Sequence, residues 1–155
     1  MKIAHLVLSN VFSGIEQHVN ELILEQQKEC EVVLICNAEI GDKFDSPNII
    51  SIENLSRKSS LGLIKLFLLI QKMNLDIIHT HGSETSSIIN LLRKFINIKH
   101  VATAHVIKNK TTPFLKANKL IAVSSKIQDS IQKDYVKINN WWSPVLPDKK
   151  KKKNN

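Results

Sequence analysis

Short apolar runs alternate with amphipathic stretches along most of the chain. The apolar runs predict strands over 2–9, 31–37, 48–53, 76–80, 99–104 and 119–123. Apolar positions that recur every third or fourth residue predict helices over 13–28, 59–73, 83–95 and 125–133. Strands that alternate with helices are joined by right-handed crossovers. The pattern therefore predicts an α/β fold, a Rossmann-like three-layer parallel sheet with helices on both faces.

Length and charge restrict this pattern to one domain with a basic tail. The 155 residues fall within the ~100 to 200 residues of a single domain. A hydrophobic share of 43% with 23% charged residues excludes a disordered or collagen-like chain. The net charge is +8, but Lys149 to Lys153 supply five of these positives, leaving +3 elsewhere. We expect a domain over 1–140 and a linker-like segment with a disordered basic tail over 141–155.

The cysteines, the first residues and this tail indicate the cellular compartment of the protein and the partners of its tail. Cys30 and Cys36 lie at opposite ends of one apolar segment, about 20 Å apart if it is extended, which predicts free thiols, in agreement with a reducing cytoplasm. The start of the chain runs into a strand without a signal-peptide pattern. Five lysines could attract the inner face of an anionic membrane by about 1 kcal/mol each, or form only a solvated extension. The tail has no aromatic residues interleaved with its lysines, which disfavours nucleic acid as a binding partner.

Ligands of such sheets bind outside the carboxyl ends of the strands, where this sequence places several polar groups. Gly14 follows the first strand, and backbone N–H groups at a helix start favour an anion. Its plainer role is to open a capped helix, since Ser13 and Glu16 have the spacing of a capping box. The glycine-rich fingerprints of dinucleotide and P-loop sites do not occur.

Three histidines also fall at this edge: His79, His81 and His105 end or follow neighbouring predicted strands. On an extended chain His79 and His81 point to one face, as a metal pair would. No Cys, Asp or Glu stands at ligand spacing, which disfavours zinc. A neutral imidazole that hydrogen-bonds a sugar hydroxyl, or that acts as acid or base near pH 7, requires less. The remaining alternative is that local backbone groups satisfy these rings.

Four motifs in order carry a resemblance to a known family. SGIEQHV follows the first strand MKIAHLVLS, and DIIHTHG, VATAH and LIAVSSKI come after it. Over residues 1–140 the sequence resembles the N-terminal half of a family 4 glycosyltransferase, so we expect one half of a GT-B fold. The resemblance implies a retaining, metal-independent enzyme of bacterial polysaccharide or lipopolysaccharide assembly. It uses a nucleotide-diphosphate sugar as co-substrate in place of a cofactor, and a glycan or lipid-linked acceptor.

The resemblance also implies site residues. In the family the glycine loop lies by the donor phosphates and the acceptor, and the Thr-x-His histidine faces the reacting sugar. The residues so implied are His105 as the catalytic residue and Ser13, Gly14, Glu16, His81 and Gly82 as substrate-binding residues, with Glu16 and His81 carried over more loosely.

The sequence departs from the family at several points. Ser13 replaces the first glycine of the loop, and Asn118 stands where an Asp is usual. Nothing matches the second domain of the family, which binds the nucleotide sugar through a basic pair and a Glu-x7-Glu motif. The lysine and asparagine codons of 149–155 suggest an adenine-rich tract and a frameshift. We expect an acceptor-side domain that is incomplete or inactive alone, either as a separate subunit that could pair with a C-terminal-type domain or as a truncated remnant. The alternative is a non-catalytic Rossmann-like binding module.

Overall fold

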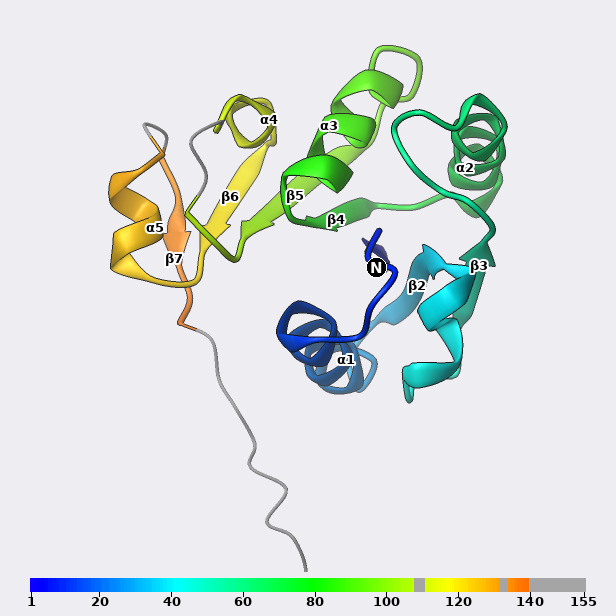
Figure 1. Ribbon diagram of the computed structural model, residues 1–155, viewed down its shortest axis with the longest axis horizontal. Helices are drawn as coiled ribbons and strands as arrows, with labels where there is room; N and C mark the ends of the chain where they lie inside the picture. Colours follow the sequence, from blue (N-terminus) through cyan, green and yellow to red (C-terminus); the bar gives the residue numbers. More distant parts are fainter. Residues whose placement is uncertain (108–110, 132–133, 140–155) are drawn as a thin grey trace, which may run out of the picture.

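The computed structural model describes residues 1–107, 111–131 and 134–139, and the predicted tail over 141–155 lies outside them. These residues build one parallel sheet with flanking helices (Figure 1). The strands are β1 (Lys2–Leu6), β2 (Glu31–Asn37), β3 (Ile49–Ile52), β4 (Ile77–His81), β5 (Lys99–Ala104), β6 (Lys119–Ala122) and β7 (Val136–Lys137). The helices are α1 (Gly14–Gln26), α2 (Ser60–Met73), α3 (Ser83–Leu92), α4 (Thr112–Leu115) and α5 (Ser125–Asp129), with a 3-10 helix η1 (Ala38–Lys43).

The strand order defines where a ligand can bind. It is β3-β2-β1-β4-β5-β6-β7, and all neighbouring strands are parallel. From β1 to β3 the strands follow one another toward one edge of the sheet, and from β4 to β7 they follow one another toward the opposite edge. The order therefore reverses between β1 and β4, which is the topological switch point of a Rossmann-like sheet. The predicted fold class is confirmed.

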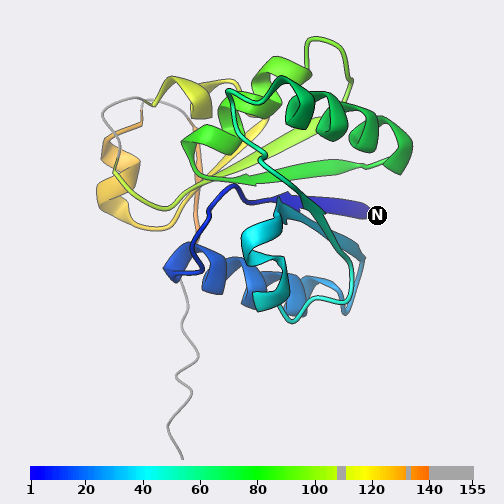
Figure 2. The same cartoon turned by 45° about the vertical axis from the view of Figure 1, so that its right-hand side comes forward.

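Helices cover both faces of the sheet. Figure 2 shows α1 on one face and α2, α3 and α4 on the other. Apolar side chains at helical spacing fill the layer between each helix and the strands, as the sequence periodicity requires. Under α1 the core contains Val19, Ile23, Val32 and Leu34. On the other face it contains Ala4, Leu6, Leu66, Ile70, Ile78, Ile88 and Ile89.

Three short elements were not predicted: η1, α4 and β7. The segment between His105 and Asn118 contains α4, in which Pro113 occupies the first turn and Phe114 is buried. Three predicted ends are also wrong by three residues or more. β1 ends at Leu6 rather than at residue 9, α3 ends at Leu92 rather than at residue 95, and α5 ends at Asp129 rather than at residue 133. After α3 the backbone tightens, since the N–H of Phe95 donates to the carbonyl of Leu92 at 2.9 Å.

The predicted free thiols are confirmed, with Cys36 buried and Cys30 half-buried. Within the described ranges, none of the helices combines the length and the apolar character that crossing a bilayer would need.

Candidate functional site

A cavity of about 390 Å³ opens at the switch point between β1 and β4. Its walls come from the loop after β1, the start of α1, the junction of β4 with α3, and the residues that follow β5. Five of the six predicted site residues line it: Ser13, Glu16, His81, Gly82 and His105. Gly14 begins α1 beside Ser13 but is not among the lining residues.

Ser13 and Glu16 fix the start of α1 at the cavity wall. The Glu16 carboxylate accepts hydrogen bonds from the Ser13 backbone N–H at 2.9 Å and from the Ser13 hydroxyl at 2.8 Å. Glu16 is only 2% exposed. The capping-box spacing therefore predicted a real contact. Because its carboxylate is engaged in this way, Glu16 supports the loop and the helix.

Gly82 shapes the wall through its backbone. It precedes α3 with a φ of 99°, a value that L side chains rarely adopt. Its N–H donates to the Thr103 carbonyl at 3.1 Å, which holds the turn against β5. Its carbonyl accepts from the hydroxyls of Thr85 at 2.9 Å and Ser86 at 2.8 Å. The residue between β4 and α3 is thus glycine because the turn requires this conformation.

We expect Gly82→Ala to lower the free energy of unfolding by about 1–3 kcal/mol, because alanine is strained at this φ. Gly14→Ala is the matched control: its backbone lacks a positive φ, and no heavy atom lies within 4 Å of an added Cβ. It should change stability by less than about 0.5 kcal/mol. Urea denaturation of both variants measures the difference. Equal losses, or a larger loss in Gly14→Ala, would contradict this account of Gly82.

A row of buried histidines lies beneath α1, next to the cavity. His5 on β1 pairs in register with His79 on β4, and His81 follows two residues later. Alternate side chains of a strand share a face, so the three rings gather on one side of the sheet. Their ring centroids are 4.4 to 5.2 Å apart. His105 reaches the same group, since its ring centroid lies 5.4 Å from that of His81.

These rings are joined by hydrogen bonds between side chains. His5 Nδ1 lies 2.9 Å from His81 Nε2, and His81 Nδ1 lies 3.1 Å from His105 Nε2. At the other end, His5 Nε2 lies 2.8 Å from Oε1 of Gln26 in the last turn of α1. We call Gln26, His5, His81 and His105 the histidine relay. The alternative in which local backbone groups satisfy these rings does not hold for the relay.

The relay histidines are neutral at pH 7. Burial lowers the pKa of His5 and His105 to about 4, with the nearby His18 adding to the effect in both. Burial, reinforced by the neighbouring histidines, holds the pKa of His81 well below its usual 6.5. The pKa of His79 is lowered in the same way, and its Nε2 lies 2.7 Å from the Thr103 hydroxyl. The cluster therefore offers neutral imidazoles to the cavity.

His5, His79 and His81 could also hold a metal ion, since one ring nitrogen of each lies within 4.8 Å of the others. The distance between the ring nitrogens of His5 and His81 favours a hydrogen bond over a shared metal ion. Two nitrogens bound to one tetrahedral zinc at ~2.05 Å lie about 3.3 Å apart, whereas His5 Nδ1 and His81 Nε2 are 2.9 Å apart. A metal would have to displace this bond. Metal independence stays a prediction.

Sequence reasoning missed His5 and Gln26. The available signal was a histidine inside an apolar run that was expected to be covered on both faces. His5 is fully buried on β1, an interior strand between β2 and β4. A buried imidazole in such a strand needs a polar partner, which would have directed attention to the adjacent strands and helix.

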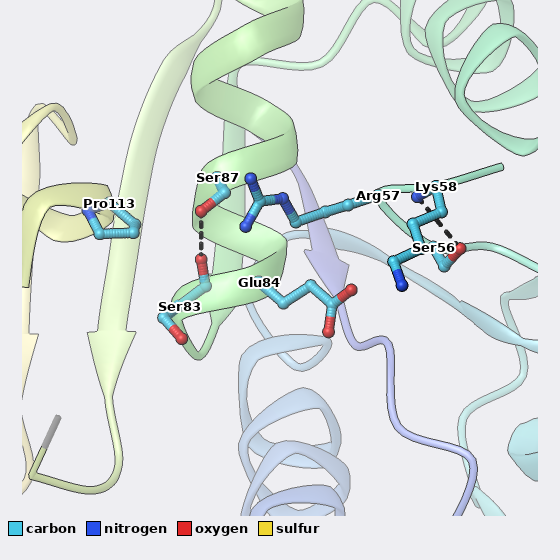
Figure 3. A pocket seen from close by; sticks show the side chains of 7 residues that line it. All are labelled: Ser56, Arg57, Lys58, Ser83, Glu84, Ser87 and Pro113. Carbon is cyan, nitrogen blue, oxygen red and sulfur yellow. Dashed lines mark hydrogen bonds between the residues drawn. The ribbon is translucent and has the colours of Figure 1, made fainter. Parts of the chain in front are cut away.

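A second cavity of about 650 Å³ adjoins the first and shares Ser83 and Glu84 with it. Its other walls are Ser56, Arg57 and Lys58 before α2, Ser87 on α3, and Pro113 on α4. Figure 3 shows Arg57 extending from its loop toward α3. Two cations and several hydroxyls give this cavity the chemistry of an anion site, with Glu84 as a single opposing charge.

The strand order and the cavity at its switch point define a Rossmann-like α/β domain, and solved GT-B glycosyltransferases share this fold in one of their halves. HepE from Anabaena in complex with UDP is 14% identical with a TM-score of 0.72, covering 92% of this chain and 44% of HepE. The lipopolysaccharide outer core galactosyltransferase WaaB in its apo form is 17% identical with a TM-score of 0.64, covering 84% of this chain and 41% of WaaB.

The family follows from the sequence. The chain matches the family model of Glycosyltransferase Family 4 over residues 12–140 and belongs to this family. It is also 33% identical over 94 residues to the UDP-Gal:alpha-D-GlcNAc-diphosphoundecaprenol alpha-1,3-galactosyltransferase of Escherichia coli, covering 55% of this chain and 24% of that protein. The predicted resemblance is confirmed. The chain spans about a quarter of this relative and less than half of the two structures above.

Proposed function

We propose that this domain is the acceptor-side half of a glycosyltransferase. It moves a sugar from a nucleotide-diphosphate sugar to a glycan or lipid-linked acceptor in polysaccharide or lipopolysaccharide assembly. The observation that carries the proposal is the position of His105, a neutral imidazole on the wall of the switch-point cavity. The ligand of HepE and the name of the Escherichia coli relative support the donor and acceptor classes.

In this proposal His105 binds the reacting sugar. Its Nε2 is bonded to His81, and its Nδ1 forms no hydrogen bond within the parts of the chain that the structure describes. A neutral imidazole can hydrogen-bond a sugar hydroxyl without placing a positive charge in the cavity. Glu16 and Gly82 act indirectly, because they hold the loop and the turn on which the cavity is built.

The second cavity is suited to the acceptor. Its Arg57 and Lys58 side chains can neutralise a diphosphate, while the Ser83 hydroxyl lies where the two cavities meet. An acceptor sugar attached to such a diphosphate would then lie toward His105. The donor diphosphate is expected to be held by a nucleotide-sugar domain of the family type, through charged groups and without a metal ion. A lipid-linked acceptor favours a site at the inner face of the membrane, with Lys149 to Lys153 assisting.

The experiment combines this chain with the nucleotide-sugar domain of a family 4 relative, either mixed or fused. Radiolabelled UDP-galactose and UDP-glucose are offered with GlcNAc carried on a short lipid diphosphate, or with the same sugar lacking the diphosphate. We expect transfer only when both domains are present, and faster transfer to the diphosphate-linked sugar. An absence of transfer with every combination would favour the binding-module alternative.

We also expect this chain alone to bind nucleotide sugars with a Kd weaker than about 1 mM, equivalent to about −4 kcal/mol. The reason is that a single glycine, Gly14, stands at the junction of the loop with α1, and this glycine does not line the cavity. Isothermal titration calorimetry with UDP-galactose, UDP-glucose and GDP-mannose measures the affinity. A micromolar Kd would show that donor affinity resides in this domain.

A further inference from the structure

We propose that Gln26 sets the tautomer of His105 through His5 and His81, so that His105 presents the lone pair of Nδ1 to the cavity. Gln26 is then a positioning residue at the far end of α1 from Ser13 and Glu16. The catalytic meaning of this inference rests on the proposed function, whereas the tautomer itself does not.

The hydrogen bonds of the relay restrict where its protons can lie. Each neutral imidazole carries one N–H and one lone pair. His5 uses both of its ring nitrogens in the relay, one toward Gln26 and one toward His81. His81 likewise uses both, toward His5 and toward His105. Each bond needs one donor and one acceptor, so all the N–H groups of the relay must point in the same direction.

Gln26 sets that direction. Its Oε1 can only accept, so His5 carries its proton on Nε2 and donates to Gln26 at 2.8 Å. His5 Nδ1 is then unprotonated, and its lone pair accepts a hydrogen bond from His81 Nε2–H at 2.9 Å. His81 Nδ1 is unprotonated in turn, and its lone pair accepts a hydrogen bond from His105 Nε2–H at 3.1 Å.

The same direction agrees with the intrinsic preference of the rings. All three histidines then carry their proton on Nε2, which is the commoner tautomer of neutral histidine. The opposite direction would require three Nδ1–H tautomers at once and a rotated Gln26 amide. The low pKa of each relay histidine supports the premise that none carries a second proton.

The result for the cavity is an acceptor, since His105 Nδ1 offers its lone pair to a hydroxyl of a sugar. With the opposite tautomer the same atom would donate. Gln26 does not line the cavity that contains His105; it lies on the wall of a separate surface hollow beside Met1 and Cys30. Its influence on the site therefore passes through His5 and His81.

The test on the wild-type chain uses ¹⁵N-labelled histidine and nuclear magnetic resonance at pH 7.5. Long-range ¹H–¹⁵N spectra give the protonated nitrogen of each ring, and couplings across the hydrogen bonds join His81 Nε2 to His5 Nδ1. We expect Nε2–H in His5, His81 and His105, with the other tautomer below about one tenth in each, because reversal would place two lone pairs face to face. A proton on Nδ1 of His105 would overturn the proposal.

Two variants then locate the origin of the tautomer. Gln26→Met keeps the length of the side chain but removes the acceptor, so both directions of the relay become accessible. We expect the ¹⁵N shifts of His105 to move toward the average of the two tautomers. Gln27→Met, on the exposed next residue of the chain, is the control and should leave them unchanged.

Unchanged ¹⁵N shifts of His105 in a folded Gln26→Met would overturn the role of Gln26. If this variant does not fold, the wild-type couplings still decide the direction.

The activity readout uses the two-domain enzyme described above. Gln26→Met should lower kcat several-fold with KM for the donor unchanged, and Gln27→Met should change neither. An unchanged kcat in a folded Gln26→Met enzyme would show that the tautomer does not matter for transfer. If the wild-type enzyme transfers no sugar, the proposed function fails, while the spectra of the chain alone still decide the relay.

Discussion

Replacing His105 with alanine should lower kcat of the two-domain enzyme by at least about 100-fold, the usual effect of losing one positioned hydrogen-bonding group in an active site. His105 lines the switch-point cavity, and its ring is held on one side by His81 at 3.1 Å. Alanine removes the group that would face the reacting sugar. It also leaves His81 Nδ1 without its partner. The measurement is steady-state transfer with saturating donor and acceptor.

Ile107→Ala is the control for this loop, since Ile107 is 57% exposed and does not line the cavity. It should retain kcat within about twofold of the wild type. The thermal midpoint of both variants shows whether the domain still folds. Turnover of His105→Ala within about threefold of the parent would mean that His105 does not contact the reacting sugar. Inhibition of the wild-type enzyme by a chelator would count against a metal-independent site.

Acid should begin to destabilise the domain well above the pH at which carboxylates titrate. His5 and His105 have pKa values of about 4 in the folded state, and His79 and His81 have pKa values well below 6.5. In the unfolded chain each would titrate near its ordinary value of ~6.5. Between these values the unfolded state binds more protons, so stability rises with pH and is lost as the pH falls from about 6.5 toward 4.

The expected slope is large. Each histidine that is protonated only in the unfolded state contributes about 1.4 kcal/mol per pH unit, so four together contribute on the order of 5 kcal/mol per unit. A domain with about 5 kcal/mol of stability, the lower end of the usual range, would then unfold near pH 5.5, and one with about 10 kcal/mol would unfold between pH 4 and 5. Urea denaturation at several pH values between 7 and 5 measures the slope.

His5→Phe is the matched variant, because it removes one titrating group from the buried row. Its stability at pH 7 falls with the lost hydrogen bonds, but its slope should be smaller by about one proton. A wild-type stability that does not change between pH 7 and 5 would show that the histidines take up protons in the folded state, and that the relay bonds do not require neutral rings.

The sequence predicted the parts of the fold that depend on repeated patterns. The buried strands and the long helices each contain several apolar residues, so their periodicity is unambiguous. By contrast α4 has four residues and β7 has two, which is too few for any period to appear. Such elements form because the surrounding sheet offers them hydrogen bonds and an apolar surface for Phe114.

The site residues that belong to sequence motifs could be predicted. A residue that joins the site only through the pairing of two strands could not. His81, Gly82 and His105 lie next to one another because the carboxyl ends of β4 and β5 meet at one edge. His5 joins them only because β1 pairs with β4 so that His5 is opposite His79. A shift of one residue would turn its ring to the other face. No local pattern in one sequence records that pairing.

The histidine relay limits how this domain can be recombined with its relatives. Gln26 and His5 come from the first strand and helix, whereas His81 and His105 come from β4 and the end of β5. A chimera that exchanges residues 1–26 alone would replace Gln26 and His5 with foreign residues while keeping His81 and His105 of the histidine relay. Where the foreign segment lacks the counterparts of His5 and Gln26, His81 would lose its hydrogen-bond partner inside the core. The smallest exchangeable unit is therefore discontinuous, with β1 and α1 inherited together with the segment 77–105.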